Sequence, residues 1–468
     1  MTRLNEMTVA QAARALRARD CSVRELWDAC CEVAYAKNPE LHAFLEIFSA
    51  DDSAINAAQK RIDTEGESAP TLCGIPLAIK DNILIEGNVA SAASKMLENY
   101  RATYDATVIK KLKEAGALFV GRTNMDEFAL GSSTENSAFG PTKNPHDLTR
   151  VPGGTSGGSA AAVAAHMAIA ALGTDTGGSV RCPASYCGVV GLKPTYGAVS
   201  RSGIIAAVSS FDQVGPIAKT VEDARIIFNT IRGLDALDST IIPDDLYPQA
   251  KKEIKTIGVP SGLLANALDK DMLEKFTFAL EKTGMKIKDI EIPSAKPALA
   301  AYYIINFAEV STNLARFDGM RYGHAASGEK LIDDYINSRT EGFGKETLRR
   351  IVLGTFVLSS GYIDAYYHKA VAAREQLTRE FDEAFKEVDL IATPTMPTPA
   401  FVIGEKSDPL TMYLEDAFTV LANLTGMPAI SVPMGTVDRE GKQLPVGIHF
   451  TAPHQSENSL FAIGSALQ

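Results

Sequence analysis

The residues best suited to chemistry lie between Val151 and Lys193, in two turns rich in glycine and hydroxyl side chains. The first turn is residues 153–159 (GGTSGGS), and the second is residues 175–179 (DTGGS). Glycine allows positive φ and lets backbone N–H groups come close to a ligand, and a row of such groups binds anions. A hydroxyl nucleophile beside an oxyanion cradle is what acyl transfer needs. Two such turns in one segment favour a catalytic role over simple tight turns.

A third candidate is Lys80, which follows the apolar, strand-like run LCGIPLAI at residues 72–79. Burial disfavours a charged ammonium group and lowers its pKa, so a lysine in this position could act as a base near pH 7. From this segment alone, the simpler alternative is a lysine that reaches solvent or pairs with its neighbour Asp81.

The elements that position these residues predict an α/β architecture. Residues 107–121 read as a helix (VIKKLKEAGA) followed by a short strand (LFVG). The alanine-rich run from Ala160 to Leu172 predicts a helix buried on most sides, which would join the two glycine-rich turns.

Elsewhere the patterns alternate in the same way. Capping boxes at Thr8–Gln11 and Ser22–Glu25 predict two N-terminal helices. Further elements are expected as a helix at 221–231, a strand at 255–259, a helix at 270–283, a strand at 286–292, a long helical stretch at 298–385, and strands at 390–393, 429–432 and 447–450.

No internal repeat or linker divides the chain, so we expect one domain over residues 1–468. N-terminal helices would occupy 1–68, the glycine-rich core 69–232, a strand–helix and helical elaboration 233–388, and strands and helices completing the core 389–468. The only tryptophan, Trp27, falls on the second expected helix, where a packing role is the simplest interpretation.

Composition limits the possible functions. A chain of 468 residues with 46% hydrophobic content can bury a large core. Its net charge of −11 argues against binding nucleic acid without a partner protein. The N-terminus lacks the apolar core of a signal peptide, and no apolar run is long enough to cross a membrane. The six cysteines show no metal spacing and predict buried free thiols. We therefore expect a cytoplasmic protein.

Several common catalytic motifs are missing. The sequence has no GxxxxGK[ST] and no HExxH, and its seven histidines form no pair at metal-ligand spacing. A G-x-S-x-G pattern at residues 154–158 would make Ser156 the nucleophile of an α/β-hydrolase, with His449 or His454 as its base. The polar, proline-broken residues before it are not the buried strand that such a nucleophile elbow follows.

Taken together, the two turns resemble the signature of the amidase-signature hydrolases. The similarity continues through GIPLAIKDN, TNMDEFALGSSTENSAFGPTKNP and GVVGLKPTYG. Later stretches, among them NLARFDGMRYG and DPLTMYLEDAFT, resemble the A subunits of bacterial glutamyl-tRNA(Gln)/aspartyl-tRNA(Asn) amidotransferases over essentially the whole chain. The resemblance implies one amidase-signature domain, an α/β fold with a central mixed β-sheet surrounded by helices.

It also implies a triad of two hydroxyls and a lysine. Ser179 matches the nucleophile, Lys80 the base, and Thr155 the relay residue, a serine on a cis peptide bond in the family. Proton transfer from Ser179 to a neutral lysine through the bridging hydroxyl is chemically sound. The developing oxyanion would be held by backbone N–H groups, those of Thr176, Gly177, Gly178 and Ser179.

For the substrate, the resemblance implies glutamine, whose α-carboxylate would bind Arg350 and whose α-amino group would bind Asp416. A guanidinium can hold a carboxylate through two parallel hydrogen bonds. Without the resemblance, both residues would be interpreted as surface charges on helices.

The implied protein hydrolyses glutamine and delivers ammonia to partner subunits, B and C, within a heterotrimer. It would need no cofactor of its own: the partner would use ATP and Mg²⁺ and bind most of the misacylated tRNA. Three residues depart from the family pattern: Thr155 for the relay serine, Cys182 for a glutamine and Ala198 for an arginine. A stand-alone amidase acting on another small amide, or a scaffold subunit impaired by Thr155, remain the alternatives.

Overall fold

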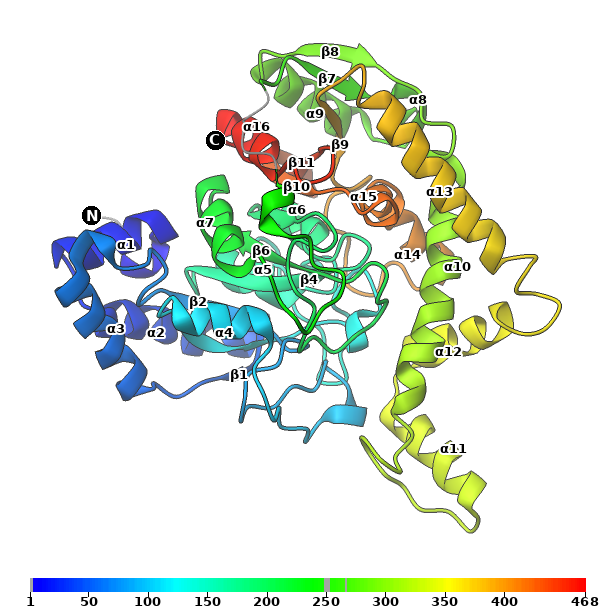
Figure 1. Cartoon of the computed structure of the whole chain (residues 1–468), viewed down its shortest axis with the longest axis horizontal. Coiled ribbons are helices and arrows are strands. Elements are labelled where there is room, and N and C mark those ends of the chain that lie inside the picture. The colour runs from blue at the N-terminus through cyan, green and yellow to red at the C-terminus, as the bar shows by residue number, and fades with distance from the viewer. Residues whose placement is uncertain (1–2, 248–252, 266) are drawn as a thin grey trace.

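The computed structural model describes residues 3–247, 253–265 and 267–468, and its centre is one eleven-stranded sheet (Figure 1). The strand order across the sheet is β1-β3-β2-β4-β6-β5-β10-β11-β9-β7-β8. The strands are β1 (Phe44–Ile47), β2 (Pro76–Lys80), β3 (Leu118–Thr123), β4 (Ala170–Asp175), β5 (Val190–Lys193), β6 (Gln213–Ala218), β7 (Thr256–Val259), β8 (Lys286–Asp289), β9 (Leu390–Pro394), β10 (Ala429–Arg439) and β11 (Lys442–Thr451).

The sheet is mixed. Strand β2 runs parallel to both β3 and β4, and β7 runs parallel to β8 and β9. The remaining pairs are antiparallel, including β4 with β6 and β10 with β11. Every residue of β2, β4 and β6 is buried, as expected for strands covered on both faces. The predicted α/β fold with a central mixed sheet is confirmed.

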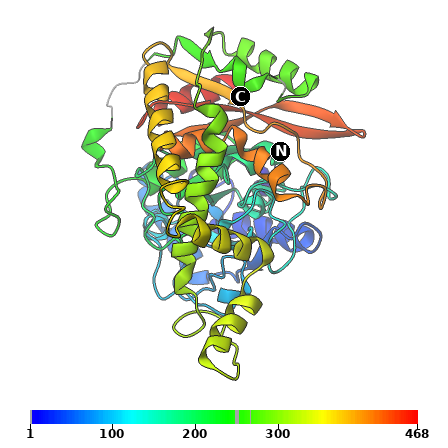
Figure 2. The ribbon, with the colours of Figure 1, turned by 90° about the vertical axis from the view of Figure 1, so that its right-hand side faces the viewer.

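Helices cover the sheet. In Figures 1 and 2 the N-terminal helices lie at one end, the long helices α10 and α13 run along the other, and α11 projects from the body. The helices are α1 (Val9–Ala18), α2 (Val23–Leu41), α3 (Asp52–Glu65), α4 (Thr107–Glu114), α5 (Gly157–Ala164), α6 (Arg181–Cys187), α7 (Val221–Ile231), α8 (Ser261–Leu264), α9 (Lys270–Lys282), α10 (Ala295–Asn313), α11 (Leu331–Gly342), α12 (Lys345–Val357), α13 (Tyr367–Ala384), α14 (Pro409–Tyr413), α15 (Val420–Thr425) and α16 (Glu457–Leu467).

The N-terminal helices form as their caps predict. The Thr8 hydroxyl accepts the Gln11 N–H while the Gln11 side chain accepts the Thr8 N–H, and Ser22 and Glu25 repeat the arrangement on α2. Each capping box satisfies backbone groups that a helix start would otherwise leave unpaired. Trp27 is 4% exposed within the main hydrophobic core, so its predicted packing role is confirmed.

The single helix predicted from Ala160 to Leu172 is wrong. Helix α5 ends at Ala164, the chain turns through His166 at φ +60°, and strand β4 begins at Ala170. Every residue of β4 and every residue of α5 except Ala164 is buried. A run that is apolar on every side carries no periodicity to separate a buried helix from a buried strand. The turn sends β4 back alongside β2, which carries Lys80.

The long helical stretch predicted at 298–385 is broken into α10, α11, α12 and α13, and the longest connection, between α10 and α11, covers residues 314–330. The strand expected at 286–292 ends early, at Asp289. Within the described chain all six cysteines are buried and free, as predicted.

Candidate active site

The amino group of Lys80 lies at the end of β2, in a cluster of oxygen atoms. Its Nζ donates to Thr155 Oγ1 at 2.7 Å, Ser156 Oγ at 2.8 Å and Thr174 Oγ1 at 2.9 Å, with Thr174 O at 3.3 Å. These partners come from the first glycine-rich turn and from β4, which runs parallel to β2. The first glycine-rich turn therefore brings the predicted relay residue Thr155 into contact with Lys80, and the parallel strand β4 brings Thr174.

Lys80 is 0% exposed, and no described carboxylate lies within the 4.0 Å of an ion pair with its nitrogen. The neighbouring Asp81 instead pairs with Arg122 at 2.9 Å, so the alternative of a Lys80–Asp81 pair is wrong. Burial lowers the pKa of Lys80 to about 7, against the smaller opposing influence of Asp126, Asp175 and Asp212. A substantial fraction of neutral amine is thus present near pH 7, as a general base requires.

The second glycine-rich turn is shaped by Asp175, the last residue of β4. Its carboxylate accepts the Gly178 N–H at 2.9 Å and the Val180 N–H at 3.1 Å. Two nitrogens of Arg181 and the side chain of Asn423 complete its shell. Burial alone would raise the pKa of Asp175, but the Arg181 guanidinium and these donors hold it well below its usual range. The ionised Asp175 carboxylate therefore holds the second glycine-rich turn in place through hydrogen bonds to its backbone.

At the tip of this turn, Ser179 is 6% exposed and its hydroxyl makes no hydrogen bond to any described residue. The N–H groups of Thr176, Gly177 and Ser179 also have no partner in the described chain, whereas the Gly178 N–H is taken by Asp175. A hydroxyl nucleophile beside N–H donors without partners provides the groups needed to attack a carbonyl and to stabilise the resulting oxyanion.

The two turns lie against each other. The Ser156 N–H donates to Ser179 O at 3.2 Å, and a Cβ added to Gly154 would lie 3.2 Å from Ser179 Cα. Thr155 contacts Lys80 but makes no hydrogen bond to Ser179 in the described structure. The cis peptide bond that the resemblance implies at Thr155 is not observed, since every described peptide bond is trans.

The sequence did not predict that Ser156 and Thr174 contact Lys80. The sequence predicts Ser156 only as an α/β-hydrolase nucleophile, but its Oγ contacts Lys80 and the backbone of Thr174, and no strand directly precedes it. His449, one of its suggested bases, has Nε2 2.9 Å from Arg181 and Nδ1 3.3 Å from Thr393. The serine–histidine pair of an α/β-hydrolase is therefore absent from the described contacts of these two residues.

Arg350 and Asp416 meet around Tyr303. Arg350, 3% exposed on α12, places its guanidinium 5.6 Å from the centre of the Tyr303 ring, and the Tyr303 hydroxyl donates to Asp416 at 2.6 Å. Glu346 and Asn306 accept from Arg350 at 2.8 and 3.2 Å. Both residues are buried, so the interpretation of either one as a surface charge is wrong.

This charged pair lies beside the Ser179 turn. A Cβ on Gly177 would lie 2.3 Å from the hydroxyl oxygen of Tyr302, the neighbour of Tyr303. Thr419, three residues beyond Asp416, donates its hydroxyl to Gly177 O at 2.6 Å. Burial raises the pKa of Asp416 to about 7, although Tyr303, Ser132 and Arg350 each oppose the rise.

Known proteins match the chain along its length. The family model described as Amidase matches residues 25–461. The chain belongs to the amidase family. It is 47% identical to the A subunit of the glutamyl-tRNA(Gln) amidotransferase of Desulfatibacillum aliphaticivorans, with 99% of this chain and 97% of that protein aligned. It is 48% identical to the protein of the same name from Thermoanaerobacter pseudethanolicus, with 99% and 96% aligned.

A solved structure agrees. The crystal structure of the A subunit of glutamyl-tRNA(Gln) amidotransferase from Thermotoga maritima superposes with a TM-score of 0.80 at 41% identity, covering 99% of this chain and 94% of that one. The resemblance to amidase-signature hydrolases inferred from the sequence is therefore confirmed. Within the described residues, no helix has both the length and the apolar character to cross a membrane.

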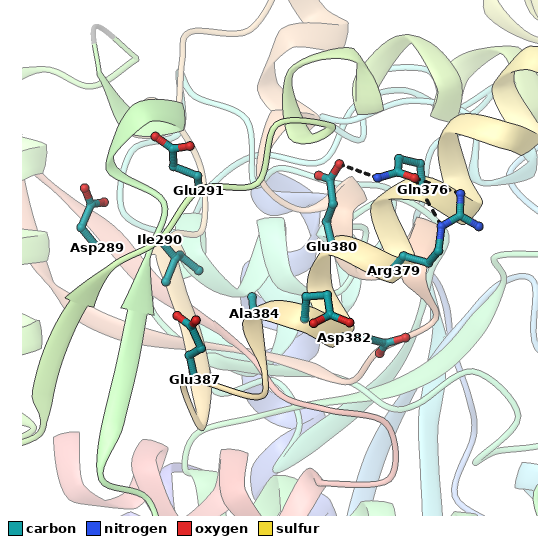
Figure 3. Close-up of a pocket in the computed structure, with 10 residues that line it drawn as sticks. Asp289, Ile290, Glu291, Gln376, Arg379, Glu380, Asp382, Ala384 and Glu387 are labelled. Atoms are coloured by element: carbon teal, nitrogen blue, oxygen red, sulfur yellow. Dashed lines mark hydrogen bonds between the residues drawn. The ribbon is translucent and has the colours of Figure 1, made fainter.

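A separate cavity of about 600 Å³ lies between β8 and α13 (Figure 3). Its walls carry six carboxylates but one guanidinium, so it would repel a substrate that bears a carboxylate. The described chain has no group of three or more His, Cys, Asp or Glu residues able to hold a metal ion. The residues lining the cavity are Asp289, Ile290, Glu291, Gln376, Arg379, Glu380, Asp382, Glu383, Ala384 and Glu387.

Amide hydrolysis by this family member should require neutral Lys80. Because its pKa is about 7, kcat should fall as the pH drops below about 7 and level off above it. Lys80→Met should lower kcat by about 10²- to 10⁴-fold, and Lys80→Arg, which stays protonated, should not restore it. Ammonia release measured across pH tests this. A Lys80→Met enzyme with wild-type kcat and the same pH dependence would contradict the assignment.

Thr155 should act through its hydroxyl, which accepts from Lys80. Thr155→Ser keeps the hydroxyl and loses a methyl that restricts χ1, so kcat should be kept or raised. Thr155→Val keeps the shape without the hydroxyl and should lose most of kcat. Steady-state kinetics of the two variants, with folding checked by thermal unfolding, provide the comparison. Equal activity in wild type and the valine variant would remove Thr155 from the mechanism.

Proposed function

We propose that this chain is the glutamine-hydrolysing subunit of an amidotransferase that amidates misacylated Glu-tRNA(Gln) or Asp-tRNA(Asn). The observation that carries the proposal is that buried Arg350 and buried Asp416 both contact Tyr303, next to the turn that bears Ser179. A simple amide would need neither charge. The names of the similar proteins, each the A subunit of a glutamyl-tRNA(Gln) amidotransferase, support the same activity.

In the proposed mechanism, neutral Lys80 takes a proton through the Thr155 hydroxyl from Ser179, whose oxygen attacks the side-chain amide carbon of glutamine. The N–H groups of Thr176, Gly177 and Ser179 stabilise the negative oxygen of the tetrahedral intermediate. The intermediate collapses as Lys80 returns the proton to the leaving nitrogen, which departs as ammonia. Water, activated by the same lysine, then hydrolyses the acyl-enzyme to glutamate.

Substrate selection follows from charge in this proposal. Free glutamine carries an α-carboxylate and an α-ammonium group, which would bind Arg350 and ionised Asp416 respectively. The Tyr303 and Ser132 hydroxyls donate to one oxygen of Asp416, Oδ2, which leaves Oδ1 for the ammonium. Within the described residues the Asp416 carboxylate has no ion-pair partner, and Arg350 has Glu346. Because a buried charge is stabilised by an opposite charge, the site should discriminate against amides that lack either group.

The ammonia would then pass to partner subunits. We assign ATP, Mg²⁺ and most tRNA contacts to the B and C subunits of a heterotrimer, and place the assembly in the cytoplasm. The net charge of −11 and the missing P-loop motif support this division of labour.

Covalent labelling identifies the nucleophile. A diazo-ketone analogue of glutamine should leave one adduct, on Ser179, because its hydroxyl is the one without a protein hydrogen bond beside unpaired N–H donors in the described chain. Peptide mapping by mass spectrometry locates the adduct, with the Ser179→Ala variant as a control that should remain unlabelled. An adduct on Ser156 would instead support the α/β-hydrolase mechanism.

Arg350 and Asp416 together form what we call the substrate clamp. Removing either charged side chain tests the proposed function. Arg350→Ala and Asp416→Ala should each lose about 2–5 kcal/mol of transition-state binding, or roughly 30- to 5,000-fold in kcat/KM for glutamine. Arg379→Ala, which removes an arginine whose hydrogen bonds within the described chain go to Gln376 on α13, is the matched control and should change nothing.

The same variants, assembled with the partner subunits, should regain amidation when ammonia is supplied directly. If both kept wild-type kcat/KM for glutamine, the clamp would be excluded and a stand-alone amidase for an uncharged amide would become the better assignment. An assembled wild type with no glutaminase activity, restored by Thr155→Ser, would identify a catalytically impaired scaffold.

A further inference from the structure

Glu127 is a buried carboxylate that the mechanism does not use. It is 3% exposed and begins a short 3-10 turn (Glu127–Ala129) in the loop after β3. Its Oε1 accepts the Ser94 hydroxyl at 2.5 Å, and its Oε2 accepts the Gly344 N–H at 2.8 Å and the Thr347 hydroxyl at 2.5 Å. The last two partners are more than 200 residues away in sequence, at the start of α12. Glu127 therefore joins the catalytic core to the helix that carries Arg350.

The start of α12 lacks a local cap. Its N-cap residue is Gly344, which has no side chain to accept the first N–H groups of the helix. Glu127 takes the N-cap N–H, the role that a glutamate three residues into the helix plays in a capping box. Its negative charge also suits the positive end of the helix dipole. A Cβ on Gly344 would lie 2.7 Å from Glu127 Oε2, so the glycine is needed for this close approach.

The position of α12 in turn fixes Arg350. Arg350 lies six residues after Gly344, and Glu346, one turn before it, accepts from its Nε at 2.8 Å. Tyr413 donates its hydroxyl to the same carboxylate at 2.9 Å. A shift of the helix start would move Arg350 and Glu346 together, relative to Tyr413 on α14.

The loop that carries Glu127 also supports the other end of the clamp. Its neighbour Asp126 accepts the N–H groups of Ser133, Thr134 and Asn136. This holds the loop so that the Ser132 hydroxyl donates to Asp416 at 2.9 Å. One short loop thus contacts the Asp416 side through Ser132 and the Arg350 side through Glu127.

We propose that Glu127 is a positioning residue that sets the separation between Arg350 and Asp416, and so determines selectivity for an amide that bears both an α-carboxylate and an α-ammonium group. This inference rests on the proposed function, because it concerns how glutamine is bound. Glu127 acts through α12 and touches neither the substrate nor Ser179. Its loss should therefore weaken recognition of the two charged groups without impairing the acylation chemistry.

Four substrates separate these effects. Glutamine carries both charged groups, glutaric acid monoamide keeps the carboxylate, 4-aminobutanamide keeps the amine, and butanamide carries neither. Glu127→Gln removes the negative charge, so the hydrogen bonds from the Gly344 N–H and the Thr347 hydroxyl go to a neutral amide oxygen and become weaker. The helix start should shift, and kcat/KM for glutamine should fall about 10- to 100-fold, mainly through KM, as small misplacements of binding groups do. Butanamide hydrolysis should remain unchanged.

Two further variants make the test specific. Gly344→Ala keeps the carboxylate but displaces it, since the added Cβ would lie 2.7 Å from Oε2, and should show the same loss for glutamine with butanamide hydrolysis unchanged. Glu135→Gln is the matched control: this glutamate also accepts a distant glycine N–H, that of Gly404 at 2.7 Å, from nearly the same part of the chain. It should keep wild-type kinetics with all four amides.

The outcomes separate this inference from the proposed function. If wild type hydrolyses glutamine no faster than butanamide, the proposed function fails whatever Glu127 does. If wild type prefers glutamine and both Glu127→Gln and Gly344→Ala keep that preference, the positioning role is overturned. An equal loss for all four amides would mean that Glu127 supports the fold in general, which also overturns the inference.

Discussion

The constraint on which the rest of the site depends is the complete burial of the Lys80 amino group among neutral oxygen atoms. A charged ammonium without a carboxylate partner is costly in such a place, and the pKa falls to about 7. The cost is limited by three hydroxyls and one carbonyl that accept from Nζ. To collect these acceptors, the chain must bring the first glycine-rich turn and β4 to the end of β2.

A second buried ionisable group, Asp175, lies next to Thr174 in β4 and is stabilised in a different way. Asp175 is equally buried but keeps its charge, because Arg181 and other donor groups surround it. The same carboxylate shapes the Ser179 turn and leaves three N–H groups of the described turn unpaired. The site thus combines Lys80, which burial keeps partly neutral, with the Ser179 turn, which the ionised carboxylate of Asp175 holds in place. The proposed substrate-binding residues add a third arrangement, in which Arg350 and Asp416 both contact Tyr303.

Much of this could be predicted where the sequence carries local signals. Capping boxes located α1 and α2, and the apolar run before Lys80 located β2. The split between α5 and β4 could not be predicted, since residues 160–172 are apolar on every side and the turn at His166 has no glycine or proline. The contacts of Ser156 and Thr174 with Lys80 depend on the parallel register of β2 and β4, which no local pattern encodes. The proximity of Arg350 and Asp416 could not be predicted either, because it depends on α12 packing with its Arg350 face toward the protein interior.

The most direct test of this account is a titration of the Lys80 amino group itself. ¹⁵N NMR of lysine-labelled protein, with the Lys80 signal assigned by comparison with Lys80→Met, follows the ionisation of Nζ through its chemical shift. The account predicts a midpoint near pH 7, well below the value of about 10.4 for a free lysine side chain. A Lys80 signal that stays protonated up to about pH 10, as in a free lysine, would contradict the central claim that burial supplies the base.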